Sequence, residues 1–199
     1  MRSLFNQKRI IIVGPALNQP KDEFLNKFDY VIRTNNFINS SISGKRCDML
    51  LLNNITSKAM NEASALKINN SNIKFIICYQ HHFHKMKRLF PEKNIIKIHR
   101  QRNIKIGRFN LKFKSIPTII YIFIINLLKN KIKFRNLFLD GIDFYMRRKK
   151  YINGYSWLIH KIERGGTHNI HQDRKFLALL IRLFRNIGTT KFIKKIAFM

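Results

Sequence analysis

The sequence predicts an α/β fold: a Rossmann-like, mainly parallel sheet flanked by helices, formed by residues 1–199 as a single domain. Apolar runs of strand length alternate with segments of helix length, which is the pattern of a parallel sheet with crossover helices. The first run, 9–13, is continuously apolar, as expected for a strand buried on both faces. With 199 residues, 45% of them hydrophobic, the chain can bury a substantial core, which excludes a mainly disordered protein.

The expected elements start near the amino terminus, which lacks the apolar core of a signal peptide and should run directly into the first strand. Arg9-Ile10-Ile11-Ile12-Val13 forms this strand, and Gly14-Pro15 ends it. Further strands are expected at 30–35, 49–52, 73–78, 95–98 and 137–140, and helices at 21–27, 57–66, 81–89, 116–128 and 173–186. The apolar segment 116–128 is too short to span a bilayer, so it is expected to form a buried helix.

The charge of the chain is its most unusual bulk property, because 39 Lys and Arg against 10 Asp and Glu give a net charge of +29. The electrostatic field of a protein with this net charge attracts nucleic acid, anionic lipid head groups or a phosphorylated substrate. The basic residues are spread over the whole chain and therefore select none of these. Cys47 and Cys78 lack metal-site or disulfide spacing and fit a reducing cytosol. We expect a cytoplasmic protein, soluble or peripheral on the inner membrane.

Polar residues follow several of the expected strands. In open parallel sheets, ligands bind beyond the carboxyl ends of the strands, and Asn35, Asn53 and Gly141–Tyr145 lie at such ends. An amide can bind a base edge, a ribose or a phosphate, although a turn Asn can equally cap its own backbone. Gly14-Pro15-Ala16 resembles half of a phosphate-binding turn, but it lacks the full GxGxxG or P-loop pattern.

Two tyrosines stand in a cationic loop, 144–167, which is expected to act as a short lid. Tyr145 and Tyr151 can donate hydrogen bonds to a phosphate, and nearby cations favour bound negative charge. The four cations are Arg147, Arg148, Lys149 and Lys150. The alternative is equally open: one tyrosine packs on the sheet and the basic loop is solvated.

Two histidines precede the last expected helix. Histidine is the usual general base for a hydroxyl nucleophile, and only His168 has a four-residue gap before Asp173, which favours it over His171. Asp173 is expected either to cap its helix or to lie near the imidazole. No third ligand and no DxD motif accompany the histidines, so no metal is expected.

These pieces, in this order, resemble the bacterial lipooligosaccharide sialyltransferases of glycosyltransferase family 42. The signature Gly141-Ile142-Asp143-Phe144-Tyr145 matches residue for residue, and Tyr151 and His168 keep the order of the family. Upstream, Arg33-Thr34-Asn35-Asn36-Phe37 is similar to the family's Arg-Cys-Asn-Gln-Phe segment. The match runs from about residue 9 to 186.

The resemblance implies a metal-independent inverting transferase of the A-type glycosyltransferase variant, with no cofactor beyond its donor substrate, CMP-sialic acid. It implies that His168 deprotonates the acceptor, a terminal sugar such as a galactoside in a lipooligosaccharide or related surface glycan. It further implies that both tyrosines contact the leaving phosphate. The substrate-binding residues that it implies are Asn35, Asn53, Ser115 or Thr118, Gly141 and Asp143.

The chain departs from the family in a first turn that lacks an Asn and a Gly, and in a shorter stretch between Tyr151 and His168. One alternative is a donor carrying another CMP-activated ulosonic acid. A basic nucleic-acid-binding protein is a second alternative, but no recognised motif supports it, so no nucleic-acid partner is expected. The basic amphipathic segment 188–199 either docks on an anionic membrane or is a frayed helix. The sequence leaves the oligomeric state open, a homo-oligomer included.

Overall fold

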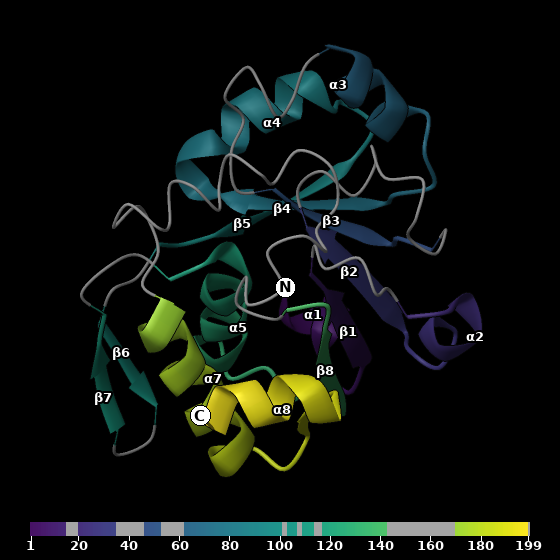
Figure 1. The fold of residues 1–199 in the computed structure, drawn as a ribbon. Coiled ribbons are helices and arrows are strands. Elements are labelled where there is room, and N and C mark those ends of the chain that lie inside the picture. Colours follow the sequence, from purple (N-terminus) through teal and green to yellow (C-terminus); the bar gives the residue numbers. More distant parts are fainter. Residues whose placement is uncertain are drawn as a thin grey trace.

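Seven parallel strands form the central sheet of the protein (Figure 1). The computed structural model describes residues 1–14, 20–34, 46–52, 62–100, 103–106, 109–113, 117–142 and 170–198. The order across the sheet is β5-β4-β3-β2-β1-β8-β9. The strands are β1 Arg9–Val13, β2 Tyr30–Thr34, β3 Met49–Leu52, β4 Phe75–Tyr79, β5 Asn94–Ile98, β8 Asn136–Asp140 and β9 Ile187–Thr189.

The chain begins at the middle of the sheet and extends it in two directions. From β1 it adds β2, β3, β4 and β5 on one side, and it then returns to pair β8 with the free side of β1. Val13 is in register with Arg33 of β2 and with Asp140 of β8, so these three strands end at the same level. The predicted Rossmann-like α/β arrangement is therefore confirmed.

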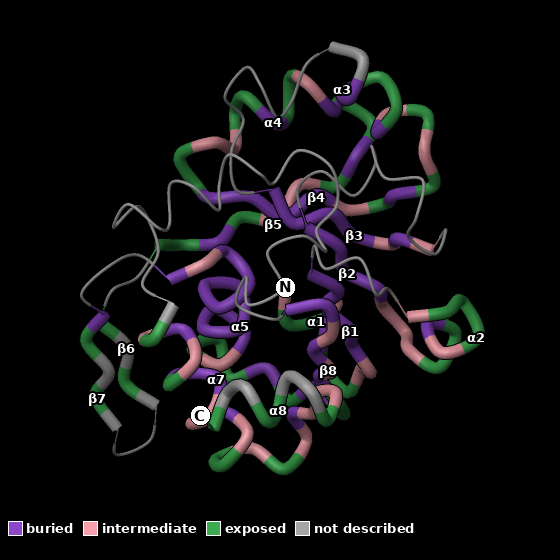
Figure 2. Tube along the Cα trace, viewed as in Figure 1, coloured by how far each residue is buried: buried purple, intermediate pink, exposed green. Residues whose placement is uncertain are grey.

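Helices cover both faces of the sheet, and alternate residues of the strands point to opposite faces. Ile10 and Ile12 pack in one core with the buried helix α5, whereas Ile11 and Val13 face α2. A third cluster packs α3 and α4 against β3 and β4 (Figure 2). The helices are α1 Arg2–Phe5, α2 Asp22–Leu25, α3 Glu62–Asn69, the 3-10 helix η2 Gln80–His82, α4 Phe83–Leu89, α5 Ile119–Lys129, α7 Ile170–Leu183 and α8 Lys191–Phe198.

The central helix α5 is apolar almost all round, and Ile119–Leu127 are buried. Such a helix belongs in a protein core, as predicted. It connects β5 to β8 after a small antiparallel hairpin, β6 Asn103–Ile106 and β7 Phe109–Lys112, which packs against α5. Within the described ranges, every helix falls short of the length and apolar character that a membrane span requires.

Several boundaries differ from the predictions. The amino terminus does not run directly into β1, because α1 precedes it and buries Phe5 in the main core. The last long helix begins at Ile170 and ends at Leu183, three residues earlier than expected at each end. The helix expected at 57–66 is described from Glu62 to Asn69, and its first residues lie outside the described ranges. The hairpin of β6 and β7 was not predicted.

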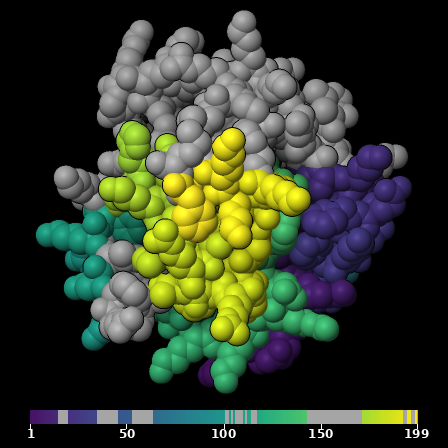
Figure 3. All heavy atoms as spheres, turned by 60° about the horizontal axis from the view of Figure 1, so that its bottom comes forward, coloured from purple at the N-terminus to yellow at the C-terminus, as the bar shows by residue number. Residues whose placement is uncertain are grey.

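The carboxyl-terminal segment 188–199 is more regular than a frayed tail. It contributes the edge strand β9, which pairs with β8, and then the helix α8, which packs on α7. Lys191, Lys194 and Lys195 are exposed, and the guanidinium carbon of Arg182 lies 5.0 Å from the ring centre of Phe198. In Figure 3 the segment that contains α7 and α8, coloured yellow-green to yellow, lies on the face turned towards the viewer.

Candidate functional site at the carboxyl ends of the strands

The topological switch point of the sheet lies between β1 and β8. After β1 the chain moves towards β2, and after β8 it moves towards β9 on the other side. The two connections diverge at this point, and open parallel sheets bind ligands beyond the carboxyl ends of strands that are related in this way. The residues that leave the two strands here are Gly14 and the Gly141 that begins the signature 141–145.

These two glycines are in close backbone contact. The Gly14 amide donates a hydrogen bond of 2.8 Å to the Asp140 carbonyl. A Cβ at Gly14 would lie 2.4 Å from the carbonyl oxygen of Gly141, and a Cβ at Gly141 would lie 2.9 Å from that of Gly14. Gly141 also has φ +62°, which side chains other than glycine adopt at a cost. The two strand ends thus pack backbone against backbone, in a contact that leaves no room for a side chain at either glycine.

Most residues expected in the site fall outside the described ranges: Asn35, Asn53, Ser115, Asp143, Tyr145, Tyr151 and His168. Gly141 and Thr118 are described. Asn35 directly follows Thr34, the last residue of β2, and Asn53 directly follows Leu52, the last residue of β3. The two strands thus end directly before these asparagines in the sequence, and the role of Asn35 and Asn53 in the site stays a prediction.

A buried arginine stands just before Asn35. Arg33 is 1% exposed, and its Nε donates to the Arg46 carbonyl at 2.9 Å. Burial lowers the pKa of Arg33, while the neighbouring Cys47 and Asp22 act in the opposite sense. Arg46 in turn donates to the Leu25 carbonyl and pairs with Asp48 at 3.1 Å. These contacts hold the carboxyl end of β2 against the segment that leads into β3.

The two cysteines are free and buried, as the lack of disulfide spacing predicted. Burial raises the pKa of Cys47 to about 12 and that of Cys78 to about 11. Both are therefore neutral thiols at physiological pH, which suits core packing rather than nucleophilic chemistry.

Asp173 joins α7 to the start of α5. Its Oδ2 accepts a hydrogen bond of 3.3 Å from the backbone N–H of Thr118, the residue just before α5. Burial raises the pKa of Asp173 to about 7 although the Thr118 backbone and hydroxyl oppose this. The Thr118 hydroxyl lies close enough to Asp173 to lower this pKa, but its position does not meet the geometry of a hydrogen bond.

The expectation that Asp173 caps its own helix is wrong. That helix begins at Ile170, so Asp173 lies within its first turn, and it satisfies a backbone donor of a different helix. The other expectation, a contact with the His168 imidazole, concerns a residue outside the described ranges.

Sequence reasoning missed a second group of polar residues at the same edge of the sheet. Tyr79 ends β4, and the guanidinium carbon of Arg100, beyond β5, lies 4.7 Å from the centre of its ring. Burial raises the pKa of Tyr79 to about 12; Arg100 lowers it and Asp173 raises it further. The rule that selected Asn35 and Asn53 also applies to Tyr79 and Arg100, because both stand where an apolar run ends.

In the part of the chain that the structure describes, no group of three or more His, Cys, Asp or Glu side chains is placed to hold a metal ion. Comparison with known protein families, curated proteins and solved structures found no match.

Proposed function

We propose that the protein is a metal-independent inverting glycosyltransferase that transfers sialic acid from CMP-sialic acid to the terminal sugar, such as a galactoside, of a lipooligosaccharide or related surface glycan. One observation carries the proposal. The signature Gly141–Tyr145 begins exactly where β8 ends, at the switch point, with Gly14 against it. A nucleotide-sugar signature at the ligand-binding edge of this fold supports a donor site there.

The order of the strands supports the way in which the donor would lie. The spatial order β3-β2-β1-β8 in the sheet puts the carboxyl ends that precede Asn53, Asn35, Gly14 and Gly141 side by side. Neighbouring strands are about 4.8 Å apart, so these four ends span roughly 15 Å. An extended nucleotide sugar can lie along such a row. We assign the cytidine end to the side of the two asparagines and the phosphate to the bare backbone of the glycines.

The chemistry is a single displacement. His168 accepts the proton of the acceptor hydroxyl, whose oxygen attacks the anomeric carbon of the donor. The bond from that carbon to the phosphate oxygen breaks, and CMP leaves with the electron pair. Tyr145 and Tyr151 donate hydrogen bonds to the departing phosphate, and the cations of the 144–167 loop balance its charge. Asp143 and either Ser115 or Thr118 contact the donor. Because this single displacement occurs on the side opposite the leaving phosphate, the configuration of the anomeric carbon is inverted.

The test is transfer from CMP-sialic acid to a panel of galactosides in the presence of a chelator. We expect chelator-resistant transfer that His168→Ala lowers by at least about a hundredfold, since a positioned base contributes about 10²–10⁴-fold. Donor binding should persist in this variant, and His171→Ala is the matched control. If the His168→Ala variant transferred the sugar as fast as the wild type, His168 would not be the general base of the reaction.

Two further arms of the same assay define the substrates. Other CMP-activated ulosonic acids are offered as donors, because the tyrosines and the histidine act on the phosphate and the acceptor rather than on the rest of the sugar. The acceptor is also presented in anionic liposomes, since the exposed lysines of α8 support peripheral association with the inner membrane. If no CMP-sugar is consumed with any acceptor, the proposed function is wrong.

A further inference from the structure

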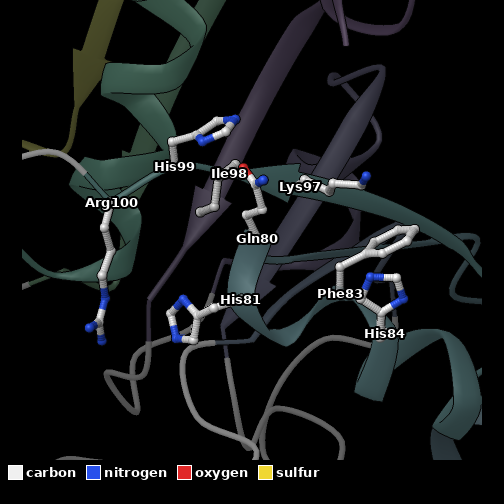
Figure 4. Close-up of a pocket in the computed structure, with 8 residues that line it drawn as sticks. All are labelled: Gln80, His81, Phe83, His84, Lys97, Ile98, His99 and Arg100. Atoms are coloured by element: carbon white, nitrogen blue, oxygen red, sulfur yellow. The ribbon is translucent and has the colours of Figure 1, made fainter.

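A hollow lies at the carboxyl edge of the sheet, at the ends of β4 and β5. It has a volume of about 460 Å³, and six of the eight described residues that line it are polar or cationic: Gln80, His81, His84, Lys97, His99 and Arg100 (Figure 4). In the strand order, β4 is separated from β1 by β3 and β2, so the hollow is distinct from the switch point. Nothing in the proposed transfer reaction uses it.

Among the described residues that line this hollow none is acidic, although two are permanent cations. The ammonium nitrogen of Lys97 lies 4.0 Å from the ring centre of Phe83, and Arg100 lies over the ring of Tyr79. Contact with an aromatic face orients a cation without neutralising its charge. Within the described ranges, ion pairs join Arg9 to Asp29 and Arg46 to Asp48, and neither Lys97 nor Arg100 has a carboxylate partner. The charge in the hollow is therefore uncompensated there.

The positive charge of the hollow acts on a histidine pair beside it. The ring of His81 stacks on Tyr79 at 5.5 Å and lies 4.0 Å from the ring of His82. Burial lowers the pKa of His82, and His81, Arg100 and Lys85 lower it further because each disfavours another positive charge. A bound anion would relieve this repulsion.

The backbone of the hollow is held by a buried amide. Asn126, 2% exposed within the apolar α5, accepts a 3.0 Å hydrogen bond from the His99 N–H and donates one of 3.0 Å to the His99 carbonyl. Burying an amide costs free energy unless it is hydrogen-bonded, and here both of its ends are used on one residue of the hollow. The end of β5 is thus fixed before any ligand arrives, which lowers the entropic cost of binding.

We propose that this hollow is a second ligand site, which binds the phosphate monoester of a small molecule or of a lipid head group. A phosphate offers several acceptor oxygens and up to two negative charges, which suits the positive charge that Lys97 and Arg100 bring to the two sides of the hollow. Figure 4 shows Gln80 between His81 and Arg100 on one side and Lys97 and His84 on the other. The amide of Gln80 can donate to the same group.

The size of the hollow selects a small ligand. Small-molecule sites have volumes of about 300–1000 Å³, and this one lies at the lower end of that range. A nucleic-acid strand needs open aromatic faces on which bases stack. Lys97 and Arg100 lie over the rings of Phe83 and Tyr79, so these faces are already covered.

The experiment is calorimetric titration of the full chain with glucose 6-phosphate, with galactose as the neutral reference. We expect saturable binding of the phosphate ester alone. Lys97→Met and Arg100→Met should each weaken it by about tenfold or more, because each removes a charge-assisted contact. The side chains of both residues are exposed, so the variants should fold. Lys74→Met is the matched control, since this exposed lysine directly precedes β4, at the opposite end of the strand from the hollow.

Vesicles of phosphatidylcholine with and without phosphatidic acid distinguish the two sources of the phosphate. Sedimentation with phosphatidic acid that Lys97→Met abolishes would identify a lipid head group, and calorimetric binding would identify a soluble ester. Binding of glucose 6-phosphate should persist in Tyr145→Phe, which separates the hollow from the proposed donor site. The proposal is wrong if neither phosphate probe binds, if Lys74→Met weakens binding equally, or if only an oligonucleotide binds.

Discussion

Two regions of the carboxyl edge, the switch point at β1 and β8 and the hollow at β4 and β5, differ in the size of the side chains that form them. At the ends of β1 and β8 two glycines remove side chains, so that the backbones of the strands touch. At the ends of β4 and β5 the edge is crowded with imidazoles and fixed cations around a hollow. The same parallel sheet thus ends in close backbone contact at β1 and β8 and in a hollow lined by side chains at the border. Tolerance to mutation should differ accordingly, because bare backbone cannot move aside whereas exposed side chains can.

The largest expected effect comes from side chains placed at the switch point. Gly14→Ala and Gly141→Ala should each lower the free energy of unfolding by about 3 kcal/mol or more, because each new Cβ meets backbone rather than a movable side chain. Positive φ at Gly141 adds about 1–2 kcal/mol. Urea denaturation measures these changes.

Gly188→Ala is the control for this prediction. There a Cβ would lie 3.0 Å from a ring carbon of Phe138, a side chain that can shift. If Gly14→Ala were no more destabilising than Gly188→Ala, the contact between the strand ends would not constrain the switch point as the comparison requires.

A smaller effect is expected at Asp173, which lies between the two regions. Its pKa is raised from an unfolded value near 3.9 to about 7, so the folded state binds the proton more tightly. Stability should therefore fall as pH rises from about 4 to 7, by roughly 3 kcal/mol, and stay at the lower value above that window. Asp173→Asn keeps an acceptor for the Thr118 N–H and removes the titration.

The measurement is urea unfolding of the wild type and Asp173→Asn at several pH values between 4 and 8. The two should be similar in stability near pH 4, and the variant should be the more stable one at pH 8. A difference that does not change with pH would mean that the carboxylate is not held in a buried, unfavourable environment.

The smallest effect is expected at Asn126, which acts only on the hollow at the ends of β4 and β5. Asn126→Leu leaves the His99 N–H and carbonyl without their partner, which should cost about 1–3 kcal/mol of unfolding free energy. Hydrogen exchange of the His99 amide should accelerate, whereas the Ile11 amide in the central strand β1 serves as the control. Equal acceleration at both amides would indicate a general loss of stability rather than release of β5.

The fold was predictable because its strands are formed by short, continuous apolar runs of the sequence. Arg9–Val13 and Met49–Leu52 were expected with the observed bounds, since a short apolar run is buried as a strand whatever lies next to it. The bounds of α7 and the presence of α1 were not predicted, because the ends of a helix depend on its capping residues and its packing partners. Of the expected site, Gly141 lies at a strand end as predicted, and the tyrosines and His168 remain predictions outside the described ranges.

By itself, the sequence determined the alternation of strands and helices, the apolar core and the presence of glycines where strands end. These properties depend on neighbouring residues, whose periodicity decides which face is buried. Only the tertiary structure decided that β8 returns to pair with β1, which puts Gly141 against Gly14. It also decided that Asn126 holds the end of β5 and that Asp173 faces Thr118. Such contacts join residues far apart in the chain, and they exist because the whole core packs in one way.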